Sequence, residues 1–77
     1  MHRRDLPVHV EMDGARLARL RYGRSTHEVE RLVEAWVVEG RWWGEAERRE
    51  YVRVLTDRAT LELYRTGGAW RLSRVID

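Results

Sequence analysis

The sequence predicts an all-β fold, built as a small antiparallel curled sheet or barrel of about six strands. Segments in which apolar and polar residues alternate recur along the chain, which is the period of strands that bury one face. The dipeptides Asp13-Gly14 and Gly67-Gly68 separate such segments and are typical of two-residue hairpin turns, because glycine accepts a positive φ. One segment departs from this pattern, and the alternative is an α+β fold with one helix at 28–38.

The first part of the chain predicts a hairpin behind a short arm. Residues 1–6 are dense in charge and a proline follows them, so we expect a flexible arm there. Residues 8–12 alternate in polarity and predict a strand, and residues 15–22 predict the strand that returns beside it. A turn is expected at 22–25, because a glycine follows Tyr22.

The next segment has an ambiguous pattern. Five apolar residues recur in it at helical spacing: Val29, Leu32, Val33, Trp36 and Val37. Ser25 and Glu28 match a capping box in front of them, so the pattern taken alone favours a helix. The strand interpretation requires a bulge at Leu32-Val33, which would let Val29 and Val33 share a face with later residues.

The last part of the chain predicts a three-stranded meander. Its strands alternate in polarity and cover 51–56, 60–65 and 69–76. Before the meander, a pair of tryptophans lies between two glycines, and residues 45–50 are expected to form a charged connector.

The aromatic residues are the main candidates for both the core and a binding surface. The chain has four tryptophans, three tyrosines and no phenylalanine, so we expect Trp36 and Trp70 to fill the core. Trp42 and Trp43 are adjacent and point to opposite sides of an extended chain. We expect one of the pair in the core and the other exposed as a binding anchor.

A second candidate surface is the face of the meander opposite its apolar side. Four side chains are expected to project from it: Tyr51, Arg53, Tyr64 and Arg71. Aromatic rings mixed with arginine are typical of a platform that stacks single-stranded nucleic acid. They are also typical of a protein-binding surface, or of a face that the first hairpin covers in a closed barrel. With a net charge of +2, unaided nucleic-acid binding is expected to be weak and sensitive to salt.

The composition argues against several classes of protein. The chain has no cysteine and its three histidines are widely spaced, so we expect no metal site and no cofactor. It carries no nucleophile elbow and no phosphate-binding loop, and we expect no enzymatic activity. No apolar run is long enough to span a membrane, which favours a cytoplasmic, soluble protein. We expect residues 1–77 to form one domain with a small core, for which a homodimer is plausible.

Three stretches of the sequence carry a resemblance to a known family. They are Leu-Arg-Tyr-Gly-Arg at 20–24, Gly-Arg-Trp-Trp at 40–43 and Trp-Arg-Leu at 70–72. On these stretches the chain, over about residues 7–77, resembles a small bacterial domain of unknown function that occurs as a stand-alone protein. A related version lies at the C-terminal end of ImuB-type proteins, the inactive Y-family polymerase homologues of translesion synthesis. Arg41 stands where those proteins usually carry glutamate.

The resemblance bears on both the fold and the function. It implies that residues 29–43 form a long bulged strand and not a helix, which completes the all-β prediction. It also implies a non-catalytic interaction module, accessory to complexes for DNA-damage tolerance or translesion synthesis, with a polymerase or repair protein as partner. The alternative function is direct binding of single-stranded nucleic acid through the aromatic and arginine face described above.

Overall fold

The structure is a computed structural model that describes residues 2–42 and 45–76, with side chains described over 6–40 and 48–76. The described chain forms seven strands: β1 (His2–Pro7), β2 (His9–Asp13), β3 (Arg16–Tyr22), β4 (Ser25–Trp42), β5 (Glu45–Thr56), β6 (Thr60–Thr66) and β7 (Ala69–Ile76). The all-β prediction is confirmed. Because this part of the chain holds no helix, it also contains no helix able to cross a membrane.

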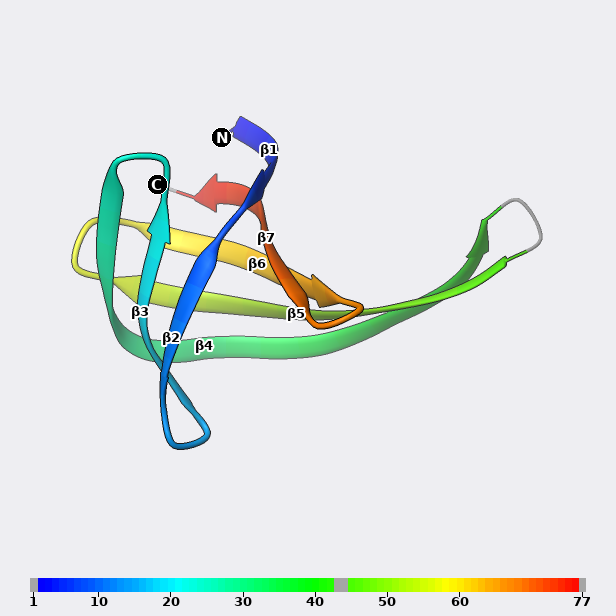
Figure 1. Ribbon diagram of the computed structural model, residues 1–77, viewed down its shortest axis with the longest axis horizontal. Coiled ribbons are helices and arrows are strands. Elements are labelled where there is room, and N and C mark those ends of the chain that lie inside the picture. The colour runs from blue at the N-terminus through cyan, green and yellow to red at the C-terminus, as the bar shows by residue number, and fades with distance from the viewer. Residues whose placement is uncertain (1, 43–44, 77) are drawn as a thin grey trace.

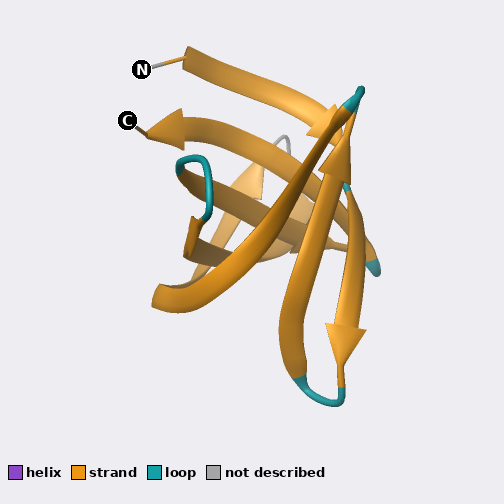
Figure 2. Cartoon of the chain, turned by 90° about the vertical axis from the view of Figure 1, so that its left-hand side faces the viewer, coloured by secondary structure: helices purple, strands orange, loops and turns teal. Residues whose placement is uncertain are grey.

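All seven strands belong to one antiparallel sheet in the order β1-β7-β6-β5-β4-β3-β2. The two outer strands follow one another in the chain and are separated by Val8, whose backbone N–H donates to the carbonyl of Trp70 at 3.1 Å. One bent segment of chain therefore pairs with β7 through its first half and with β3 through its second. This continuity curls the sheet into a half-barrel (Figure 1 and Figure 2).

Strand β4 occupies the segment whose spacing resembled a helix, so the helix alternative at 28–38 is wrong. The register between β4 and β5 shifts between Val29 and Arg31 and again between Leu32 and Glu34. Each bulge adds one residue and turns the following side chains to the other face. The apolar residues of one face are consequently spaced three, three and two apart, which imitates helical periodicity: Val29, Leu32, Ala35 and Val37. The bulge expected at Leu32-Val33 is confirmed, but Val33 is its extra residue and is exposed, so Leu32 and not Val33 shares the face of Val29.

Two further expectations differ from the structure. The arm predicted at 1–6 is instead largely strand β1, which pairs with β7. The connector predicted at 45–50 is the first half of β5, which pairs with the end of β4 in a long projecting hairpin (Figure 1). The charged composition does not prevent this pairing, because opposite charges face each other across the two strands. The Nε of Arg48 lies 3.5 Å from a carboxylate oxygen of Glu39.

The hydrophobic core lies on the concave face of the curled sheet. Its buried members are Val8, Leu20, Val54, Leu61, Leu63 and Leu72. Trp70 packs against this cluster as expected, although it is only half-buried. Trp36 does not, and its predicted place in the core is wrong. It lies opposite Tyr51 in the register, and cross-strand partners share one face of a sheet.

Candidate functional site

The convex face of the sheet brings together the side chains that the sequence singled out. Strand register aligns four residues across β4, β5, β6 and β7: Trp36, Tyr51, Tyr64 and Arg71. We call these four the aromatic row. Arg53 lies on the same face in the neighbouring row, opposite Glu62. Tyr51, Arg53, Tyr64 and Arg71 thus share a face as expected, and Trp36 joins them.

The rings of the aromatic row are occupied by the protein's own side chains. The centroids of Trp36 and Tyr51 are 5.3 Å apart with an interplanar angle of 7°, and those of Tyr51 and Tyr64 are 5.4 Å apart. The guanidinium of Arg49 lies 4.7 Å from the centroid of Tyr64, and that of Arg53 lies 5.4 Å from Trp36. Tyr64 is 6% exposed. Since a base needs a free ring face to stack upon, this geometry favours a packing role for the row.

The row beside the rings is a network of arginine and carboxylate. Glu62 is 2% exposed and accepts hydrogen bonds from Arg53 at 3.1 Å, Arg74 at 3.0 Å and Ser73 at 3.0 Å. Arg53 also donates to Glu34 at 3.1 Å. Burial acts to raise the pKa of Glu62, but the hydrogen bonds from Arg74, Arg53 and Ser73 outweigh it and hold that pKa below its ordinary value. The charge of Arg53 is therefore already compensated within the chain.

We expect Tyr51→Ala to lower the free energy of unfolding by about 2 kcal/mol, because it removes the ring between Trp36 and Tyr64. Urea denaturation followed by tryptophan fluorescence measures this change. Tyr51→Phe is the matched control and should unfold like the wild type, because it keeps the ring. A Tyr51→Ala protein of unchanged stability that loses affinity for a labelled single-stranded oligonucleotide would instead identify the row as a nucleic-acid platform.

A buried histidine lies at the other end of the sheet, where β4 begins. The ring of His27 stacks on Tyr22 with centroids 5.2 Å apart, and its Nδ1 is 3.4 Å from the hydroxyl of Thr56. Burial and then the charge of Arg58 lower the pKa of His27, although Asp57 opposes them. The imidazole is therefore neutral at neutral pH and packs as an aromatic ring. Within residues 2–42 and 45–76, no three potential ligands gather to hold a metal ion.

Of the two predicted tryptophan anchors, the structure describes only the backbone of Trp42. Trp42 is the last residue of β4 and pairs with Glu45 through the backbone. Trp43 lies outside the described residues, as does the side chain of Trp42. Their proposed binding role accordingly stays a prediction.

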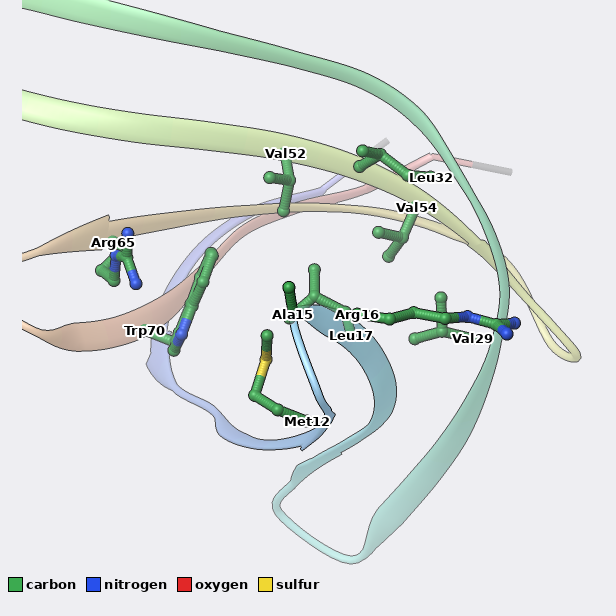
Figure 3. A pocket seen from close by; sticks show the side chains of 10 residues that line it. All are labelled: Met12, Ala15, Arg16, Leu17, Val29, Leu32, Val52, Val54, Arg65 and Trp70. Atoms are coloured by element: carbon green, nitrogen blue, oxygen red, sulfur yellow. The ribbon is translucent and has the colours of Figure 1, made fainter.

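A second candidate site, which sequence reasoning missed, is an apolar groove of about 310 Å³ at the open side of the half-barrel (Figure 3). Ten residues from six strands and one turn line it: Met12, Ala15, Arg16, Leu17, Val29, Leu32, Val52, Val54, Arg65 and Trp70. We call this site the groove. Figure 3 shows Leu32, Val52 and Val54 on one side of it, Met12, Ala15 and Leu17 of the β2–β3 hairpin on the other, and Val29 beside Arg16.

The groove exists because the pairing of β3 with β4 ends partway along both strands. They pair from Tyr22 opposite Ser25 as far as Arg19 opposite Glu28. Beyond that point β3 continues with β2, and β4 bends away with β5. The concave face between them is left uncovered, which explains why Leu32 remains 54% exposed beside the core. No local sequence signal marks this divergence, because it depends on how far two strands stay paired.

The charged residues that line the groove are both arginines. Arg65 donates to Glu50 at 2.9 Å, and its guanidinium lies 5.2 Å from the ring centroid of Trp70. Arg65 thereby holds Trp70 as a wall of the groove. Arg16 has no hydrogen-bond or ion-pair partner among the described residues. The groove thus combines an apolar lining with one uncompensated positive charge.

Comparisons of the chain with protein-family models, with curated proteins and with solved structures find no match.

Proposed function

We propose that this chain is a non-catalytic protein-interaction module that binds an apolar segment of a partner protein in the groove. The observation that carries the proposal is the groove itself, an apolar hollow of about 310 Å³ that opens directly onto the core. Concave apolar sites with a few polar groups at their edge are the usual form of binding sites.

The exposed apolar side chains at the rim of the groove favour binding of a partner. Leu32 and Met12 lie on opposite sides of the groove and are each about half exposed. A partner side chain of valine or leucine size gains about 1.5–3 kcal/mol when it is fully buried. Two such side chains, together with the covering of Leu32 and Met12, give binding in the range of transient interaction domains.

The class of partner is proposed from the resemblance alone. The likeness to the C-terminal domain of ImuB-type proteins supports a partner that acts in DNA-damage tolerance or translesion synthesis. A second copy of this chain is the competing occupant, and a concentration-dependent mass in sedimentation experiments would identify it.

We expect peptides from a random library displayed on phage to be enriched on the wild-type protein and to lose at least tenfold in affinity for Leu32→Asp. The charge places a carboxylate at the rim of the groove, where Leu32 is exposed and its replacement costs the fold little. Fluorescence anisotropy of the enriched peptides measures the affinities.

Val38→Asp is the matched control. It introduces the same charge at another exposed position of β4, outside the groove, and should bind the peptides like the wild type. A library that yields no enriched peptide, or peptides that bind Leu32→Asp as tightly as the wild type, would refute docking in the groove.

A further inference from the structure

The divergence of β3 and β4 leaves two backbone edges facing an open space. In the described chain, residues 30–42 of β4 pair with β5 alone, and residues 16–18 of β3 pair with β2 alone. The two strands form a fork whose closed end is the pair Arg19 and Glu28. Unpaired strand edges present free N–H and C=O groups and are templates for another strand.

The fork and the groove are the same place. Val29 and Leu32 of β4 and Arg16 and Leu17 of β3 line the groove and belong to the diverging strands. An extended segment that entered here would find backbone partners at its sides and an apolar surface beneath alternate side chains. A compact side chain or a helix uses the apolar surface but leaves these edges unpaired, so the site fits an extended strand best.

Charge selects among extended segments. The groove is lined by no acidic residue, and Arg16 carries a charge without a partner in the described chain. A carboxylate that reaches Arg16 would meet a guanidinium that needs to break no existing ion pair. A basic segment would face uncompensated repulsion at the same point.

We propose that the groove accepts an extended acidic-apolar peptide, which adds as a strand in the fork between β3 and β4 and places a carboxylate on Arg16. This inference rests on the proposed function and names the chemistry of the partner. The apolar side chains of the peptide face the groove, and its backbone bonds to the outer edge of β4 at Arg31, Leu32 and Glu34, the residues of 30–34 that keep register around the two bulges.

The peptides that are enriched from the phage library test this inference. We expect them to alternate apolar and polar residues and to share an aspartate or glutamate. Arg16→Ala should weaken their binding about fivefold at low salt, and Arg16→Lys should recover part of the loss. Arg24→Ala is the matched control, because Arg24 is exposed at the turn between β3 and β4, outside the groove, and should leave binding unchanged.

Hydrogen exchange separates strand addition from simple apolar contact. We expect backbone amides within residues 30–34 to exchange at least tenfold more slowly in the peptide complex. Peptides that bind through Leu32 but leave these amides unprotected, or that ignore Arg16→Ala, would overturn strand addition while the interaction function stands. Failure of every peptide to bind would overturn both.

Discussion

Leu63→Ala will lower the free energy of unfolding by about 3 kcal/mol. Leu63 is 0% exposed on β6, in the middle of the cluster that the half-barrel encloses. Truncation removes buried methyl groups and leaves a cavity that the flanking strands of a paired sheet cannot fill by moving. A domain of this length has a total stability of about 4–12 kcal/mol, so the variant should be partly unfolded at moderate temperature.

Urea denaturation followed by circular dichroism and tryptophan fluorescence measures this loss. Leu32→Ala provides the matched control, since the same atoms are removed from a leucine that is half exposed at the groove. It should cost less than about 1 kcal/mol. Equal losses for the two leucines would show that the core does not lie where this structure has it.

The second large effect concerns the buried carboxylate. Glu62→Gln should lower the free energy of unfolding by about 2 kcal/mol at neutral pH, because it leaves Arg53 and Arg74 without the negative charge they share. The loss is smaller than for a fully buried pair, since both arginine side chains remain about one-third exposed and reach water. Glu34→Gln, which removes the exposed carboxylate from the same Arg53, should cost less than about 0.5 kcal/mol.

The contribution of Glu62 also depends on pH. Its pKa in the folded protein lies below the ordinary value of 4.5, so the unfolded chain binds a proton more readily than the folded one. The stabilisation is therefore fully present above pH 4.5 and is lost as the pH falls through the lowered pKa. Unfolding curves of wild type and Glu62→Gln should differ at pH 7 and converge as the pH falls below the lowered pKa of Glu62. Curves that stay equally far apart at neutral and acidic pH would contradict a charged Glu62.

The two faces of the sheet differ in how far their side chains are covered. On the convex face, Tyr51 packs against Tyr64, and Arg53 donates to Glu62 and lies over the ring of Trp36. On the concave face, the core is left open where β3 and β4 diverge. The aromatic surface that the sequence offers as a binding site is therefore largely satisfied within the chain, and the uncovered surface lies on the opposite side.

Features that depend on neighbouring residues in the chain were predictable. Period-two alternation is local, so it identified β2, β3, β6, β7 and the second half of β5. The signal for the turns is equally local, since it comes from adjacent glycines. Gly67 and Gly68 adopt φ values of 60° and 84°, as a two-residue hairpin requires. The same alternation placed Tyr51, Arg53, Tyr64 and Arg71 on one face before any register was known.

The sequence by itself thus determined the strands that alternate in polarity, their turns and the shared face of Tyr51, Arg53, Tyr64 and Arg71, since each of these follows from residues a few positions apart. Only the tertiary structure decided that β4 is a strand and not a helix, its first bulge at Glu30, the place of Trp36, the pairing of β1 with β7 and the groove. The physical reason is that register and strand divergence are set by hydrogen bonds to a partner strand distant in sequence. A bulge that inserts one residue also reverses the faces that alternation predicts.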